Sequence, residues 1–172
     1  MRLSTLSIEE LTPAQRNAWD VIAGTRGRVI GPYQVLLQRP DLAIAVANLG
    51  TELRFKGTLP GADRELAILS VGSEWGARFE WSTHEPIARK EGVDPAAIAA
   101  LQNGTPIDAL APRAQLVVRI ARALCRDHTV DDALYARALA EFGEPMLVEL
   151  ITLVGFYCLI SCVLDGFAVE PG

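Results

Sequence analysis

The feature that most constrains the fold is a regular series of helix-start and helix-stop signals along the 172 residues. Thr12-Pro13, followed by Gln15, has the form of a capping box with proline at the first helical position. Asp94-Pro95 repeats the start signal, and glycines follow several apolar stretches as stop signals. No stretch alternates apolar and polar residues for long, as a strand would. The sequence therefore predicts an all-α protein with seven or eight helices.

The predicted helices share apolar residues at helical spacing, as in Leu116, Val117, Ile120 and Leu124. Residues 25–40 are expected to form a loop with a short helical turn, because glycine and proline interrupt them. No repeat and no shift in composition marks a domain boundary, so residues 1–172 are predicted to form a single domain. The segments expected to be helical are 13–24, 42–55 (with Asp41 as its cap), 64–76, 77–92, 96–101, 113–126, 133–143 and 144–166.

Composition excludes several classes of protein. Half of the residues are hydrophobic but only 6% are aromatic, and an Ala- and Leu-rich chain of this kind is typical of packed helices. The net charge of −5, from 16 basic and 21 acidic residues, argues against a nucleic-acid-binding protein. The first eleven residues contain Glu9 and Glu10 and lack the basic start and apolar run of a signal peptide. A cytoplasmic protein with a small-molecule partner is expected.

The most apolar segment is residues 150–164, which carry no charge. This run is shorter than the roughly 20 residues that a membrane-spanning helix needs, and Glu149 and Asp165 bracket it closely. We therefore expect a helix buried in the core or in a subunit interface, and no membrane association. An apolar helix on so small a chain predicts a homo-oligomer.

The three cysteines, Cys125, Cys158 and Cys162, form no Cys-x-x-Cys pair. Cys158 and Cys162 lie within the apolar segment, where a cysteine usually acts as a small buried hydrophobic residue. A redox or metal-binding role for the cysteines is the alternative interpretation.

The residues most suited to chemistry are His84, Glu80 and Glu65. Glu80 precedes His84 by four residues, so the two side chains share one helix face, and Glu65 lies on the preceding helix. From spacing alone, Glu80 and His84 are typical of an exposed ion pair on a helix surface. The three side chains together are also legitimate metal ligands, although no metal-binding motif is present. The other histidine, His128, lies in a polar hinge and is expected to be solvated or to cap a helix C-terminus.

Residues 64–92 resemble the core motif of the carboxymuconolactone decarboxylase and alkylhydroperoxidase D-like superfamily. The resemblance rests on Arg64-Glu65-Leu66-Ala67-Ile68-Leu69, on Glu80-Trp81-x-x-His84 and on Ala88-x-x-x-Gly92. Gly31-Pro32-Tyr33 and Arg39-Pro40-Asp41 upstream, and Leu147-Val148-Glu149-Leu150 and Gly155-Phe156-Tyr157 downstream, extend it over most of the chain. It implies a helical bundle assembled as a homotrimer or homohexamer.

One departure from this family separates two kinds of chemistry. Peroxidase members carry Cys-x-x-Cys seven and four residues before the histidine, where this chain has Ala77 and Glu80. Thiol peroxidase activity by the family's mechanism is therefore not expected, because a carboxylate cannot replace the thiolate nucleophile. Glu65 and His84 match the family's proton-relay glutamate and its histidine. The decarboxylase branch lacks the cysteine pair and removes CO2 from a carboxylated lactone without a cofactor.

The resemblance thus implies a cofactor-independent lyase or isomerase acting on a small carboxylated, lactone-like or enolisable molecule. His84 would transfer the proton, Glu80 would orient it or act as the partner base, and Glu65 would serve as the relay. Arg78 or Arg54 would hold a substrate carboxylate, and Tyr33 would line the pocket. The alternative is a relative that lost catalysis and serves as a ligand-binding or assembly protein.

Overall fold

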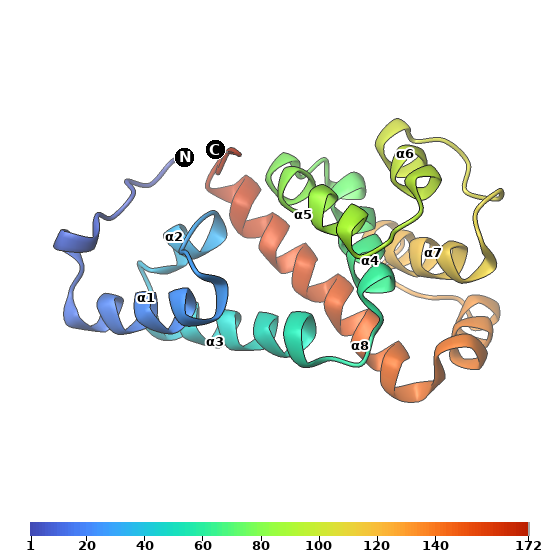
Figure 1. Cartoon of the computed structure of the whole chain (residues 1–172), viewed down its shortest axis with the longest axis horizontal. Coiled ribbons are helices and arrows are strands. Elements are labelled where there is room, and N and C mark those ends of the chain that lie inside the picture. Colours follow the sequence, from blue (N-terminus) through green and yellow to red (C-terminus); the bar gives the residue numbers. More distant parts are fainter. Residues whose placement is uncertain (172) are drawn as a thin grey trace. The chain divides into compact units, whose positions relative to one another are not determined.

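The computed structural model describes residues 1–171, and their regular structure is entirely helical (Figure 1). The predicted all-α class and the predicted number of helices are confirmed for this part of the chain. A 3-10 turn, Ile8–Glu10, and a π-helical turn, Glu52–Lys56, accompany the α-helices. The eight α-helices are α1 Pro13–Arg26, α2 Pro32–Leu36, α3 Pro40–Thr51, α4 Gly61–Trp75, α5 Arg78–Lys90, α6 Pro95–Asn103, α7 Pro112–Arg126 and α8 Asp132–Gly166.

The predicted helix starts are more accurate than the predicted helix ends. Thr12 caps α1 as expected, since its hydroxyl accepts from the Gln15 backbone N–H and the Gln15 side chain accepts from the Thr12 N–H. The predicted stop at Gly24 is wrong. The helix continues to Arg26 and ends where Gly27 adopts a left-handed conformation with φ 73°, which glycine reaches at no steric cost.

Helix α3 also differs from its prediction at both ends. It begins at Pro40, so Asp41 lies in the first helical turn instead of at the cap. A carboxylate there still faces the positive end of the helix dipole. The α-helical hydrogen bonding stops at Thr51, and the π-helical turn completes the segment for which the sequence predicts a continuous helix.

The chain groups into two compact units, of which the first comprises Met1–Gly57 and the C-terminal residues from Cys162 onward. Within it, α1 and α2 each pack against α3. Arg26 connects the end of α1 to α3, because its guanidinium donates to the Ala47 carbonyl at 2.8 Å and to the Thr51 hydroxyl at 3.2 Å. The same guanidinium lies over the ring of Tyr33, 4.7 Å from its centroid.

The second unit, Thr58–Ser161, is organised around α4, which packs against α5, α6 and α7. Residues 65–72 of α4 are all buried, which explains why this stretch is mostly apolar, with Glu65 and Ser70 as its two polar residues. From α8, Leu150, Leu153 and Val154 join the core.

Glu149 on α8 hydrogen-bonds to two residues of the loop that leads into α4. Its carboxylate accepts from the Thr58 N–H at 2.7 Å, from the Thr58 hydroxyl at 3.0 Å and from the Leu59 N–H at 3.1 Å. Three hydrogen bonds to one carboxylate are a strong local constraint, since charge-assisted bonds exceed neutral ones in strength. The start of α4 is therefore anchored to α8.

Helix α8 is divided by Gly143, whose φ of 69° and ψ of 169° are not helical. The predicted start of the last helix at Glu144 is thereby confirmed. By length and composition alone, α8 could cross a membrane, and half of its most apolar 18-residue window is buried inside the protein. Core helices of soluble proteins share these properties, so the absence of membrane association stays a prediction.

Gly143 offers a test of the kink. Replacing Gly143 with alanine is expected to destabilise the protein by about 1–3 kcal/mol, because a residue with a Cβ is strained at this φ and ψ. No atom lies within 4 Å of the added Cβ, so the cost is purely conformational. Gly155→Ala is the matched control, since Gly155 lies in the same helix, also with free space around a Cβ. It should instead stabilise the helix by about 0.5–1 kcal/mol. Urea unfolding measures the change in stability of both variants. Equal changes would contradict the proposed backbone strain at position 143.

Candidate functional site

Four buried side chains from three helices meet in the second unit. Glu65 comes from α4, Glu80 and His84 from α5, and Tyr157 from α8. The His84 Nδ1 lies 2.7 Å from a Glu65 oxygen. On the other side of the ring, Nε2 lies 3.2 Å from the Tyr157 hydroxyl and 3.4 Å from a Glu80 oxygen. The structure thus brings together the three residues that the sequence singled out, and adds a tyrosine.

A tight connection between α4 and α5 sets up this arrangement. Gly76 ends α4 in a left-handed conformation with φ 62°, and α5 starts at Arg78. Glu80 and His84 are then separated by one helical turn and point to the same side. Glu65 faces them from the first part of α4, which packs along α5.

Burial decides between two interpretations of the Glu80–His84 pair. The exposed fractions are 1% for Glu65, 4% for Glu80 and 3% for His84. The surface ion pair that spacing alone favoured is therefore wrong, because all three side chains are buried. Buried ionisable groups are costly unless they are paired. Here each finds its partner within the cluster, which we call the His84 cluster (Glu65, Glu80, His84 and Tyr157).

The hydrogen bonds give the two imidazole nitrogens different roles. A carboxylate can only accept, so the 2.7 Å contact with Glu65 places a proton on Nδ1. Nε2 is then the nitrogen that gains or loses a proton. Its neighbours are a hydroxyl that can donate or accept and a second carboxylate. The Tyr157 ring meets the imidazole edge-on, with 5.2 Å between ring centroids, and fixes its tilt.

Sequence reasoning missed two residues at this site. Tyr157 belongs to the Gly155-Phe156-Tyr157 motif, whose local pattern assigns no role to the hydroxyl. Arg64 also lies beside the cluster: its Nε donates to a Glu65 oxygen at 3.4 Å, and one of its terminal nitrogens lies 3.8 Å from Glu91. Arg64 is the first residue of the matched motif, and its position next to Glu65 was the available signal.

Three further residues were predicted to bind substrate: Arg78, Tyr33 and Arg54. Arg78 is exposed at the start of α5, two residues before Glu80. Tyr33 belongs to the first unit, where it is half-buried on α2 beside Arg26. Arg54 also belongs to the first unit, with its guanidinium 5.1 Å from the centre of the Phe55 ring. Roles in substrate binding remain predictions for all three.

The cysteines depart from their predicted environment. Cys158 is only partly buried and Cys162 is exposed, so the prediction that both are buried hydrophobic residues is wrong. The reason is that an uncharged helix need not be buried on all sides. Along α8, Leu150, Leu153 and Tyr157 are buried, whereas Val148 and Leu159 are exposed.

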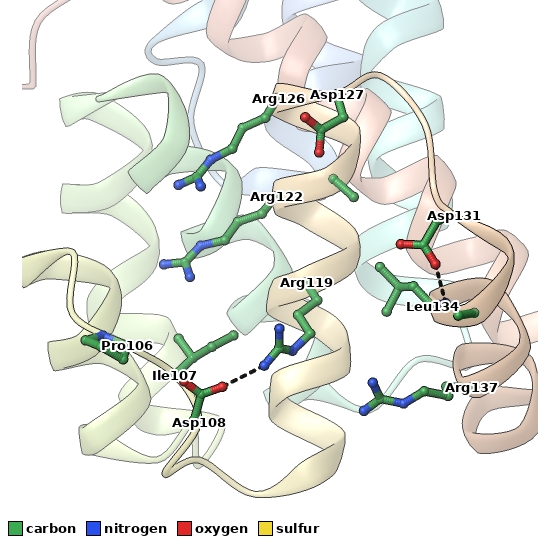
Figure 2. Close-up of a pocket in the computed structure, with 12 residues that line it drawn as sticks. Pro106, Ile107, Asp108, Arg119, Arg122, Arg126, Asp127, Asp131, Leu134 and Arg137 are labelled. Atoms are coloured by element: carbon green, nitrogen blue, oxygen red, sulfur yellow. Dashed lines mark hydrogen bonds and ion pairs between the residues drawn. The ribbon is translucent and has the colours of Figure 1, made fainter.

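A pocket of about 530 Å³ is lined by residues 106–108, by α7 and by the first part of α8 (Figure 2). Arg119, Arg122 and Arg126 of α7 are among the residues that line it. Arg119 donates to Asp108 at 2.7 Å, and Arg122 and Arg126 both pair with Glu74. Carboxylates already balance the charges of these three arginines. We therefore interpret the arginines as part of an ion-pair network and do not take the pocket as a second candidate site. Within residues 1–171, no group of three or more His, Cys, Asp or Glu side chains is arranged to hold a metal ion.

Residues 40–123, which include α4, α5 and most of the His84 cluster, match the carboxymuconolactone decarboxylase family. The fold agrees with this match, as the solved structures below show. Residues 40–123 therefore belong to the carboxymuconolactone decarboxylase family. No curated protein matches the chain.

Solved structures show that the chain shares its fold with known proteins. An alkylhydroperoxidase AhpD core protein from Ralstonia eutropha JMP134, described as an uncharacterized peroxidase-related protein, is 19% identical with a TM-score of 0.80, covering 99% of this chain and 92% of its own. A peroxidase-related protein from Silicibacter sp. TM1040 is 16% identical with a TM-score of 0.75, covering 98% and 92%. A cysteine-to-alanine variant of the debrominase Bmp8, in complex with 2,3,4-tribromopyrrole, is 14% identical with a TM-score of 0.74, covering 100% and 92%.

Proposed function

We propose that this superfamily member is a cofactor-independent acid–base enzyme, either a decarboxylase-like lyase or an isomerase. Its substrate would be a small carboxylated, lactone-like or enolisable molecule. The observation that carries the proposal is the buried series of contacts from Glu65 through His84 to Glu80 and Tyr157. An imidazole held between carboxylates is suited to moving a proton.

In this mechanism Glu65 is a positioning residue. Its carboxylate keeps the proton on Nδ1 and stabilises the imidazolium that forms when Nε2 takes up a second proton. Arg64, at 3.4 Å, holds the other oxygen of Glu65 in place. Because both contacts are buried or nearly so, water competes with them little.

The reacting proton moves through Nε2. In a decarboxylation, the carbon–carbon bond to the carboxylate breaks, its electron pair enters the unsaturated system, and the Nε2 proton is transferred to carbon. In an isomerisation, Nε2 takes a proton from one carbon and returns it to another. Glu80 and Tyr157 are the groups that exchange a proton or hydrogen bond with Nε2 between these steps.

Two comparisons support this chemistry over thiol-based peroxide reduction. The positions where peroxidase members carry their cysteine pair hold Ala77 and Glu80. Glu80 is 4% exposed and points at the imidazole, so a carboxylate occupies the place next to the proton relay. The debrominase of this fold is seen with tribromopyrrole, a small unsaturated ring, which fits a substrate class that can delocalise charge.

The proposal is tested by proton exchange, which reports on the acid–base step whatever the final product. Wild-type protein in D2O should catalyse deuterium incorporation into, or CO2 release from, some member of a panel of β-keto acids and lactone carboxylic acids, followed by NMR. Glu80→Gln is expected to lower that rate about 10²–10⁴-fold, because the partner of Nε2 can no longer carry a charge or accept its proton. Equal rates for the variant and the parent would contradict the role of Glu80.

One observation favours a second candidate function. Both imidazole nitrogens already have partners, and every member of the His84 cluster is nearly inaccessible. Such a cluster also suits a buried polar network that stabilises a ligand-binding or assembly protein without catalysis. Absence of exchange with the whole panel, together with a large loss of stability in the His84 variants, would favour this alternative.

Assembly is proposed to be trimeric or hexameric. Several large apolar side chains are exposed on α8, with exposed fractions of 66% for Val148, 46% for Tyr135 and 42% for Leu159. Exposed apolar side chains grouped on one element are typical of interfaces. Light scattering after size-exclusion chromatography is expected to give three or six times the chain mass of 18.6 kDa. A monomeric mass at micromolar concentration would contradict the proposal.

A further inference from the structure

We infer that Cys125 and Cys158 form a redox-active dithiol that exchanges with small apolar disulfides, at a site separate from the His84 cluster. Cys125 lies near the end of α7 and Cys158 lies on α8. Their sulfur atoms are 3.7 Å apart, although 33 residues separate them in the sequence. Cys158 follows Tyr157, but successive helical side chains point about 100° apart, so the thiol faces another part of the unit.

The two thiols share a pocket of about 360 Å³. Its walls are mainly apolar, from Leu124, Ile151 and Val154, with Trp75 and His128 completing the lining. Both cysteines are intermediate in exposure, so a small molecule that enters the pocket can reach the sulfurs. The apolar walls favour an uncharged reactant over a highly charged one.

The surroundings of the pair give the two thiols unequal acidity. The thiol of Cys125 donates to Cys158, and this hydrogen bond, aided by the Trp75 indole N–H and by His128, lowers the pKa of Cys158 to about 6. The same interaction, burial and the nearby charge of Glu74 raise the pKa of Cys125 well above its ordinary value. Near neutral pH, Cys158 is therefore a thiolate nucleophile and Cys125 a protonated partner.

The exchange proceeds in two steps. The Cys158 thiolate attacks one sulfur of the small disulfide, a new S–S bond forms, and one small thiolate leaves and takes up a proton from water. Cys125 then gives up its proton to solvent and attacks the Cys158 sulfur, and the second small thiolate leaves. The dithiol is oxidised to a disulfide within the chain, and one small disulfide is reduced to two thiols. The sulfurs must approach from 3.7 Å to about 2.0 Å, which is within the range of side-chain rotation.

The experiment uses the whole chain carrying Cys162→Ser. Trypsin leaves positions 158 and 162 on one peptide, residues 138–172, and Cys125 on another, residues 123–126. The substitution therefore makes Cys158 the one cysteine of its peptide. The reduced protein is incubated at pH 7 with 2-hydroxyethyl disulfide, quenched with an alkylating agent and digested. We expect a linked pair of these two peptides, and its reversal by a reductant. Glutathione disulfide, which is charged, should react more slowly.

Single variants assign the order of steps. With Cys125→Ser, the mixed disulfide on Cys158 should accumulate, because the partner thiol that displaces it is missing. With Cys158→Ser, the reaction should slow at least tenfold, since Cys125 lacks a lowered pKa. Circular dichroism checks that both variants are folded. No linked peptide, a link only between two chains, or an unchanged rate in Cys158→Ser would each overturn the inference.

Discussion

Replacing His84 with glutamine is expected to lower proton exchange and turnover by about 10²–10⁴-fold. Glutamine keeps hydrogen-bonding capacity on both sides, but its amide cannot take up and release a proton as Nε2 does. The side chain is 3% exposed and contacts Glu65 and Tyr157 directly, so water does not easily replace it. The rate of deuterium incorporation in D2O, per folded protein, measures the effect.

Glu85→Gln is the matched control for the His84 variant. Glu85 is the next residue on α5 and pairs with Arg89 at the surface, with no contact to the His84 cluster among the interactions of the described residues. Its loss should leave exchange unchanged and cost about 0–1 kcal/mol of stability. If His84→Gln and Glu85→Gln both retained parental turnover, His84 would not be the proton-transfer group.

Glu65 is expected to show the second large effect, and its two variants separate positioning from folding. Glu65→Gln keeps the size of the side chain but removes the charge that stabilises the imidazolium, so kcat should fall about 10²–10⁴-fold. KM should change little, since Glu65 contacts His84 and Arg64 instead of the substrate. Steady-state kinetics on the substrate identified in the exchange panel measures kcat and KM separately. Glu65→Asp should restore part of kcat.

Glu65→Ala addresses stability. Removing the carboxylate leaves the imidazole and Arg64 without their buried partner, and breaking a buried pair in this way costs about 3–5 kcal/mol. Urea unfolding measures the loss. A fall in kcat for Glu65→Gln, with a native unfolding midpoint, supports a positioning role. A parallel loss of turnover and stability in every variant would assign Glu65 to folding alone.

The helices could be predicted where one residue type forces the backbone. Proline at the first helical position marks α1 and α6, and these starts agree with the structure. The end of α1 could not be predicted, because Gly24 and Gly27 offer the same freedom and packing decides that Gly27 takes the left-handed conformation. Gly143 is a different case, since its neighbours Glu144 and Pro145 already signal a new helix start.

The site was predictable only where its residues lie close in sequence. Glu80 and His84 are one turn apart, and the family motif adds Glu65. Tyr157 reaches the cluster from 73 residues away, and nothing in its local pattern distinguishes it from a core aromatic residue. The same holds for Cys125 and Cys158, whose proximity depends on how α7 packs beside α8. Contacts between distant helices require the packed structure.

Through the hydrogen bonds from Thr58 and Leu59 to Glu149, α8 indirectly affects the proposed proton transfer. Glu149 and Tyr157 lie on the same uninterrupted part of α8, and Glu149 anchors the segment that leads into α4 and Glu65. One helix therefore fixes both the hydroxyl beside Nε2 and the start of the helix that carries the carboxylate beside Nδ1. A shift of α8 moves both partners of the imidazole together, so substitutions along this helix should alter proton transfer even where they touch no reacting atom.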